Sequence, residues 1–462
     1  MSNISTKGIP TELGTEKIGK LLVQYAIPAI IAQTAASLYH MIDSIFIGQG
    51  VGALAISGLA TTFPFLNLSA AFGAMIGVGG ATQLSVKLGQ RDYDSACIIL
   101  GNLLTLNIIV GGLFGGISLL FLDDILYFFG ASEATLPYAR DFMEVVLYGN
   151  AITHMYLGIN AALRASGHPK ESMYATIITV VCNIILAPLF IYVFDWGIRG
   201  AALATMFSQI VTLLWQLKLL SNPNELLHLR KGIYALRARF VKGILGIGLS
   251  PFLINAAACI VVIIINKGLR TYGDNGDMAI AAYGIANRMI FIFIMVILGV
   301  TQGMQPIIGY NFGARHYDRV KETLKQTMWW AFGVTFTGFA LCEGMPELVA
   351  RAFTTDATLI ANAAKGMRIS AFFIILAGVQ MVATNFFQSV GKVNKAIFLS
   401  LTRQVLFLIP LLIILPRYMG ENGVWYSIPI ADFISGILAI VLLKQQFNNW
   451  NNPAFAADKA QK

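Results

Sequence analysis

One carboxylate stands out in the run SLYHMIDSIFIGQGVG, residues 37–52, because Asp43 is surrounded by Met, Ile and Phe. If this run is a helix, Ser37, His40 and Ser44 share a polar stripe and Asp43 lies beside it. A charge at bilayer depth costs at least ~2.5–3.5 kcal/mol, so such residues are usually paired or functional. Two interpretations stay open: Asp43 binds a proton or cation, or it lies at the outer end of a helix and meets water.

Four further charged residues lie inside apolar runs: Glu144, Arg288, Arg403 and Asp432. At a rise of about 1.5 Å per residue, Arg288, Arg403 and Asp432 lie at similar depths. Asp432 could therefore pair with either arginine. We expect a structural ion pair, with gating or substrate contact as the alternative. Glu144 could be solvated in an outer cavity or touch a cationic substrate.

Neutral polar residues are candidates for a substrate cavity. Gln302, Gln305 and Gln380 lie in apolar runs of the second half. Amide side chains are also common links between membrane helices, so that role is an equal alternative. Tyr39, one turn before Asp43, is the aromatic candidate, and His40 is more readily a hydrogen-bonding cavity residue than a proton relay.

These residues must be positioned by membrane helices, because the 462-residue chain is 56% hydrophobic and only 12% charged. Soluble domains average about 25% charged residues. A helix needs about 20 apolar residues to cross the hydrocarbon core. Twelve runs are long enough: 20–47, 53–86, 96–122, 135–162, 171–194, 200–221, 243–266, 279–311, 326–349, 358–387, 396–416 and 423–443.

The sequence gives little support for a metal site, an enzyme active site or a nucleic-acid-binding surface. The four cysteines lie in apolar runs without CxxC spacing, and no metal-spaced Cys/His set is present. Motifs such as HExxH, GxSxG and GxxxxGK[ST] are missing from the sequence, so we expect neither an enzyme nor an ATP-driven pump. The net charge of +9 is concentrated in short connections and not in a basic patch with exposed aromatics, so we expect no nucleic-acid partner.

The basic residues predict the orientation. With the N-terminus inside, roughly two-thirds of the Lys and Arg residues fall in inside segments, as the positive-inside rule requires. An even number of spans places the C-terminus on the same side.

Four short patterns recur in order at a spacing of 223–226 residues. The pairs are LGQRDYD (88–94) with FGARHYD (312–318), SEATL (132–136) with TDATL (355–359), GIRG (197–200) with GENG (420–423), and SGLA (57–60) with YGIA (283–286). An even number of spans per half makes the two repeats parallel.

The sequence thus predicts an all-α membrane protein of twelve transmembrane helices in two parallel six-helix repeats. The expected segments are an N-terminal tail (1–19), an N-lobe (20–221), a linker (222–242), a C-lobe (243–445) and a C-terminal tail (446–462). In this repeat Pro28 and Asp43 correspond to Pro251 and Asn266. Because the second half has the amide and not the acid, we expect ion chemistry in the first half.

The segments LYHMIDSIFIGQGVGALAISGLA, QGMQPIIGYNFGARHYDRVK, NIILAPLFIY and GIRGAALAT closely resemble the multidrug and toxic compound extrusion family, in its MepA-like bacterial branch. The resemblance covers about residues 15–445. It implies two lobes in a V around a central cavity, and an inner-membrane antiporter that exports cationic, amphipathic compounds in exchange for H+ or Na+. The family's ion-coupling Asp, Asn and Thr match Asp43, Asn183 and Thr205.

One departure bears on the coupling ion. Many members of the family have NIILDP where this chain has NIILAP, so Ala187 replaces a carboxylate. A Na+ site needs several oxygen ligands, whereas a single buried aspartate can carry a proton. The choice between H+ and Na+ stays open, and we favour H+.

A flippase for a lipid-linked precursor on a related fold is the alternative function, with Arg288 and Arg403 as candidates for binding a pyrophosphate. We expect no cofactor, a monomer in the lipid bilayer, small-molecule substrates, and a bacterial plasma-membrane location with both termini cytoplasmic.

Overall fold

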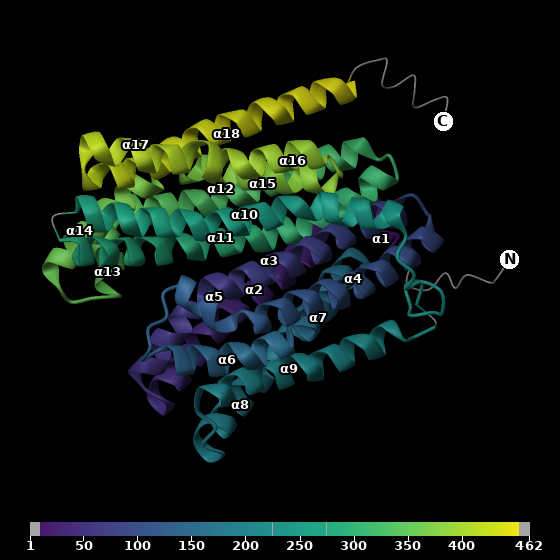
Figure 1. The fold of residues 1–462 in the computed structure, drawn as a ribbon. Coiled ribbons are helices and arrows are strands. Elements are labelled where there is room, and N and C mark those ends of the chain that lie inside the picture. Colours follow the sequence, from purple (N-terminus) through teal and green to yellow (C-terminus); the bar gives the residue numbers. More distant parts are fainter. Residues whose placement is uncertain (1–9, 224, 274, 452–462) are drawn as a thin grey trace. The chain divides into compact units, whose positions relative to one another are not determined.

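The computed structural model describes residues 10–223, 225–273 and 275–451, and these residues form helices joined by turns, with no strand among them. Figure 1 shows the arrangement of the helices. In the first half they are α1 (Glu12–Thr15), α2 (Ile18–Gly50), α3 (Ala53–Gly89), α4 (Tyr93–Leu120), α5 (Leu122–Phe128), α6 (Leu136–Tyr148), α7 (Asn150–Ala165), α8 (Pro169–Pro188), the π-helix η1 (Leu189–Val193) and α9 (Gly197–Leu220). In the second half they are α10 (Ala238–Tyr272), α11 (Gly276–Gly313), α12 (Tyr317–Gly344), α13 (Pro346–Arg351), α14 (Ala357–Ala371), α15 (Ile374–Ser389), α16 (Val393–Leu401), the π-helix η2 (Thr402–Leu408), α17 (Ile409–Met419) and α18 (Glu421–Asn451).

Each of the twelve predicted spans coincides with a helix or with consecutive helices. Among the described residues, nine helices are long and apolar enough to cross a membrane, or ten if the bent pair α14 and α15 is one span. The fourth predicted span is divided into α6 and α7, of 13 and 16 residues. The ninth is α12, whose first turns carry a charge cluster that includes Asp318, Arg319 and Lys321.

The chain divides into two compact units. The first holds the described residues up to Ala256, together with Leu298–Thr323 and Ser389–Gly391. The second holds Ala257–Ile297, Leu324–Gln388 and the described residues from Lys392 onward. The predicted lobe boundaries at residues 221 and 243 stay a prediction.

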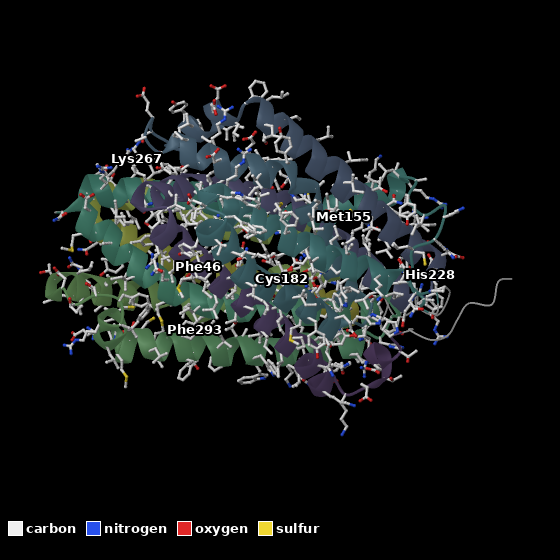
Figure 2. All side chains as sticks on the ribbon, turned by 90° about the horizontal axis from the view of Figure 1, so that it is seen from below. Phe46, Met155, Cys182, His228, Lys267 and Phe293 are labelled. Carbon is white, nitrogen blue, oxygen red and sulfur yellow. The ribbon has the colours of Figure 1, made fainter. Side chains whose placement is uncertain are left out.

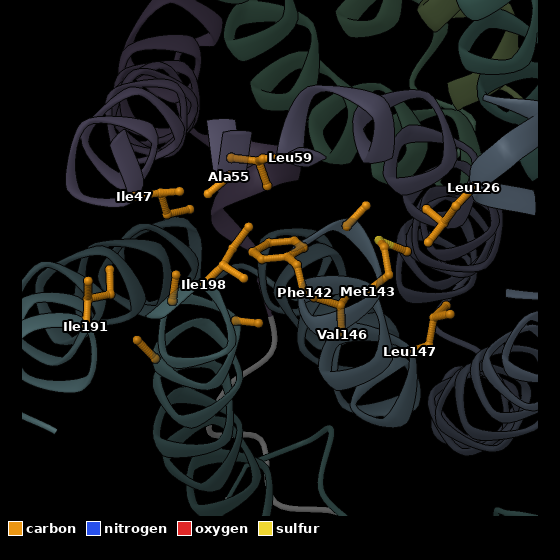
Figure 3. Packing of buried hydrophobic residues seen from close by; sticks show 14 of the residues in the cluster. Ile47, Ala55, Leu59, Leu126, Phe142, Met143, Val146, Leu147, Ile191 and Ile198 are labelled. Carbon is orange, nitrogen blue, oxygen red and sulfur yellow. The ribbon is translucent and has the colours of Figure 1, made fainter. Parts of the chain in front are cut away.

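In the first unit α3 packs against α4 and α7, and α8 lies between α2 and α9. One apolar cluster joins α2, α3, α5, α6, α8, η1 and α9, with Ile47, Leu59, Phe142 and Ile198 among its buried members (Figure 3). Because lipid is as apolar as these side chains, close van der Waals packing is what stabilises such a cluster between membrane helices. This cluster fixes the helices that carry the polar residues described below.

The second unit has its own apolar cluster. It joins α10, α11, α12, α14, α17 and α18, and Leu269, Met367 and Trp425 are buried in it. Since α18 also packs against η2 and α14, the cluster holds the helices that carry Arg403 and Asp432.

Two of the four repeated pairs share a positive-φ residue at the equivalent place. Arg91 and Arg315, at equivalent places in the first pair, have φ of 58° and 61°. Gly197 and Gly420, in GIRG and GENG, have φ of 53° and 60°. Positive φ is uncommon for a residue other than glycine, so the shared left-handed arginines support the repeat.

The turn between α3 and α4 is held by a local capping group. Asp92 accepts a hydrogen bond from the Ser95 amide at 3.2 Å and one from Lys87 at 2.8 Å. Burial opposes ionisation, but these donors hold the pKa of the Asp92 carboxyl below its usual value. The equivalent residue of the second repeat is His316, so this cap belongs to the first repeat.

Candidate ion-coupling site

Three polar side chains from three helices meet in the first unit. The Tyr39 hydroxyl on α2 lies 2.9 Å from the Thr205 hydroxyl on α9. Asn183 on α8 donates its amide N–H to the same Thr205 oxygen at 3.1 Å. Because α2 packs against both α8 and α9, residues far apart in sequence form one cluster, which we call the Tyr39 cluster (Tyr39, Asn183 and Thr205).

Asp43 lies one helical turn after Tyr39 and interacts electrostatically with it. The Asp43 residue is 6% exposed. Its Oδ1 atom is buried and has no hydrogen-bond partner among the described residues. Burying an unpaired carboxylate oxygen is unfavourable unless it is neutralised. The arrangement therefore favours a group that takes up a proton or a small cation over one that meets water at a helix end.

Ala187 lies one turn after Asn183 on α8 and is fully buried. It belongs to the apolar cluster that also contains Ile47 and Ile191. At this position the chain therefore supplies apolar packing and no oxygen ligand. The Tyr39 cluster itself supplies two hydroxyl oxygens and the Asn183 amide oxygen.

The polar stripe predicted around Asp43 includes His40 and Ser37. The His40 side chain lies outside the described part of the structure, so its predicted place in a cavity stays untested. The Ser37 hydroxyl donates to the Gln33 carbonyl of its own helix at 2.9 Å.

The residues predicted to line a substrate cavity make hydrogen bonds to different partners in the structure. Glu144 accepts a hydrogen bond from Arg199 at 3.4 Å near the start of α9. Gln305 joins α11 to α3 through bonds to Thr82 (2.7 Å) and the Val78 carbonyl (3.3 Å).

The remaining two glutamines lie in different units. Gln380 is buried and donates to the Leu399 carbonyl at 2.8 Å and to Thr384 at 3.2 Å, so α15 is tied to α16. Gln302 is half-buried on α11 in the first unit. The geometry of Gln305 and Gln380 is that of interhelical links, and a contact with substrate stays a prediction for all three glutamines.

In the second unit Asp432 pairs with Arg403. The Arg403 Nε atom donates to Asp432 Oδ1 at 2.5 Å, and the Asp432 side chain is 4% exposed. Arg288 is exposed on α11. Of the two arginines that could pair with Asp432 by their depth in the membrane, Arg403 is the one that does. A role for this pair in gating stays a prediction.

The sequence analysis did not identify a second set of polar contacts in the first unit. Thr179 on α8 lies 2.8 Å from Thr212 on α9, and Thr153 on α7 donates to Gln209 at 2.5 Å. The signal was present in the sequence as polar residues recurring at three- and four-residue intervals in three predicted spans.

Comparison with known proteins places this geometry in a family. The MatE family model matches residues 28–189 and 247–414. The multidrug export protein MepA of Staphylococcus haemolyticus is 27% identical over 430 residues, covering 92% of this chain and 93% of that protein. MepA of Staphylococcus aureus is 26% identical over 429 residues, with the same coverage.

The fold is also that of solved transporters. The outward-facing structure of a multidrug resistance MATE family transporter of the MOP superfamily superposes with a TM-score of 0.90 at 24% identity, over 97% of this chain and 99% of that one. Together with the helices suited to cross a membrane, these matches identify a multi-pass membrane protein. The chain belongs to the MatE family.

Proposed function

We propose that this protein is a secondary antiporter that exports amphipathic organic cations in exchange for protons entering the cell. Asp43 binds the proton, and the Tyr39 cluster orients the binding site. Uptake of the proton changes the charge at the centre of the first unit, and this change alternates the protein between its outward-open and inward-open states.

The observation that carries the proposal is the state of the Asp43 carboxyl. It is buried beside the Tyr39 cluster, and one of its oxygens has no hydrogen-bond partner among the described residues. Ionisable residues inside membrane spans are rare and mark ion pathways and proton relays. A carboxyl with an unused oxygen is suited to accept a proton and to release it again.

The ligand set supports a proton over Na+. Hard cations bind through several oxygen atoms, and carboxylates are their strongest ligands in proteins. Ala187, one turn from Asn183, supplies a methyl group within an apolar cluster. Asp43 is thus the anionic ligand near the Tyr39 cluster. One carboxylate is enough to bind a proton, but it makes only a weak Na+ site.

The charges elsewhere support an exporter of cations over a flippase for anionic lipid-linked precursors. A pyrophosphate group would require uncompensated arginines. Of the two arginines predicted for such a site, Arg403 is neutralised by Asp432, and Arg288 is exposed on α11. The curated relatives are named multidrug export proteins, which agrees with this substrate class.

The test is transport in proteoliposomes that contain purified protein, with ethidium and norfloxacin as probes. An imposed pH gradient should drive efflux by the wild type, and a Na+ gradient alone should not. Asp43→Asn removes the proton site at nearly constant shape and should abolish pH-driven efflux while ethidium still binds.

Asp94→Asn is the matched control, because it makes the same change in a side chain that is 78% exposed and pairs with Arg230. This control should transport like the wild type. If Asp43→Asn transports normally, the proton site is elsewhere. If efflux responds to Na+ alone, the choice of ion is wrong.

A further inference from the structure

Three helices of the first unit each carry a polar face of equal length. On each helix the four residues recur at intervals of three or four, so they share one side. The faces are Thr153, Tyr156, Asn160 and Arg164 on α7, Ser172, Thr176, Thr179 and Asn183 on α8, and Thr205, Gln209, Thr212 and Gln216 on α9. Each spans about 16 Å at the rise of an α-helix. We call these twelve residues the polar column.

Hydrogen bonds join the three faces along this length. Near Tyr39, Asn183 contacts Thr205 at 3.1 Å. In the middle, Thr179 contacts Thr212 at 2.8 Å.

At the other end the bonds join α7 to α8. Asn160 donates to Thr176 at 3.1 Å and accepts a hydrogen bond from Ser172, and Arg164 donates to Ser172 at 2.9 Å. Tyr156 interacts with Thr176, Thr179 and Asn160. The column therefore begins at the Tyr39 cluster and ends near the connection between α7 and α8.

The hydroxyls of the column can reverse their hydrogen bonds. A threonine hydroxyl has one proton to donate and can accept from others. Thr179 faces both the Ala175 carbonyl (3.0 Å) and Thr212, and Thr212 faces both the Ser208 carbonyl (3.0 Å) and Thr179. Only one of the two can donate across the pair at a time, so the direction can switch, as proton transfer along hydroxyls and water requires.

The Gln216 side chain indicates that the column also binds polar groups that do not belong to the protein chain. Its side chain is fully buried. Neither Nε2 nor Oε1 has a hydrogen-bond partner among the described residues. Buried polar groups of this kind are usually satisfied by buried water. By its spacing from Thr205 and Thr212, Gln216 lies on the column side of α9.

A cavity of about 450 Å³ lies at the Arg164 end of the first unit. Its lining includes Leu163, Ser166 and Trp215, which are next to or near Arg164 and Gln216 in sequence. The lining also supplies the ionisable groups at this end, namely His168, Glu171, Lys218 and Glu225. His168 and Glu225 lie 3.8 Å apart. Figure 2 shows nitrogen and oxygen atoms gathered near His228 at this end, whereas Cys182, next to Asn183, lies nearer the middle.

Arg164 is the last residue of the column on α7, next to this cavity. It is partly buried, donates to Ser172 and makes no ion pair with a described residue. A fixed positive charge in a narrow pathway is a barrier to protons and other cations. The positive charge of Arg164 therefore opposes the passage of protons while the Arg164–Ser172 bond is intact.

We infer that the polar column is the route by which the proton leaves Asp43 for the α7–α8 end, with Arg164 as the barrier against uncoupled leak. The inference rests on the proposed function. The Asp43 carboxyl gives up its proton to the hydroxyls and bridging water of the column and returns to a carboxylate, and the proton passes to water or to a carboxylate of the cavity.

The test compares Thr212→Val and Gln216→Leu with the wild type in pH-driven ethidium efflux from proteoliposomes. Both variants remove the relay group and keep nearly the same volume. We expect kcat to fall about tenfold, or ~1.4 kcal/mol in the barrier, with KM for ethidium unchanged. Thr212→Ser keeps a hydroxyl and should restore the rate if Thr212→Val impairs folding. Thr335→Val is the matched control, since Thr335 is equally buried and bonds the Ala331 carbonyl of its own helix.

Arg164→Gln supplies the second arm. In liposomes without drug, it should raise the proton leak reported by a trapped pH-sensitive dye, and Arg164→Gln with Thr212→Val should lower it again. Wild-type rates for Thr212→Val and Gln216→Leu, in a preparation in which Asp43→Asn is inactive, would overturn the route and leave the proposed function intact. Normal transport by Asp43→Asn would overturn the function itself.

Discussion

At the scale of single residues, substitution of Tyr39 tests whether its hydroxyl is needed for transport or only for stability. Tyr39→Phe removes its bond to Thr205, which should lower the free energy of unfolding by about 0.5–1.5 kcal/mol. Because Tyr39 also interacts electrostatically with Asp43, we expect severalfold slower pH-driven efflux as well. The measurement is ethidium transport alongside the melting temperature in detergent.

Tyr192→Phe is the control for this change. Its hydroxyl donates to the Phe46 carbonyl at 3.0 Å, seven residues along α2 from Tyr39, and within the described part of the chain Tyr192 makes no hydrogen bond to Asn183 or Thr205. A similar loss of stability with unchanged transport is expected. Equal transport by the two variants would show that the Tyr39 hydroxyl only stabilises the fold.

The Arg403–Asp432 pair makes a prediction about stability. Asp432→Asn leaves a guanidinium uncompensated in the second unit, which should cost about 3–5 kcal/mol. The exposed pair of Asp94 and Arg230 should cost only about 0.2–1 kcal/mol when broken by Asp94→Asn. Thermal unfolding in one detergent compares them. Melting temperatures that agree for the two variants would contradict a stabilising role for the buried pair.

At the residue level, chemistry alone distinguishes Asp43, an acid in an apolar run. The structure buries it and places it beside Tyr39, and its ion-coupling role stays a prediction. The partner of Asp432 was not predictable, because depth along a span follows from counting residues but rotation about the helix axis does not. Only the packing of α18 on η2 brings Arg403 to Asp432.

At the scale of helices, close backbone contact explains several glycines of the first unit. A Cβ atom on Gly79 of α3 would lie 2.0 Å from the Ile244 carbonyl oxygen of α10. Gly79→Ala must therefore separate the two backbones, and we expect it to lower stability by about 1–3 kcal/mol. The measurement is the melting temperature of the purified protein.

Gly112→Ala on α4 is the matched substitution. A Cβ atom there meets nothing within 4 Å. Alanine is the better helix former by up to ~1 kcal/mol, so this variant should be as stable as the wild type or more so. A destabilised Gly112→Ala together with an unaffected Gly79→Ala would refute the packing argument.

Helix prediction worked for the spans and failed at their interruptions. Every run that hydropathy predicts as a span is helical in the structure, since bilayer thickness sets a strong length requirement. It did not predict the break between α6 and α7, the 51° bend between α14 and α15, or the π-helix over Thr402–Leu408. These features depend on how the side chains of neighbouring helices pack together, and the hydropathy of an apolar run does not report this packing.

At the scale of the whole molecule, the two predicted repeats share backbone features but differ in their polar residues. They share left-handed arginines at Arg91 and Arg315. The first repeat has Asp43 where the second has Asn266, and the polar column lies in the first unit. Duplication thus explains the shared backbone, whereas the proposed ion chemistry depends on later divergence of one copy.

The direction of the proposed transport depends on the orientation of the chain in the membrane, which fusions at two comparable turns can establish. Gly130 lies between α5 and α6, and Gly167 lies between α7 and α8, both with positive φ. Arg164 and Lys170 flank the second turn, whereas Asp123, Asp124 and Glu133 flank the first, so the positive-inside rule places Gly167 in the cytoplasm. An alkaline phosphatase fusion after Ala131 should therefore be active, and one after Gly167 inactive, with green fluorescent protein fusions giving the opposite pattern. The reverse result would turn the Arg164 end of the polar column to the outside, where it could only load protons and not release them.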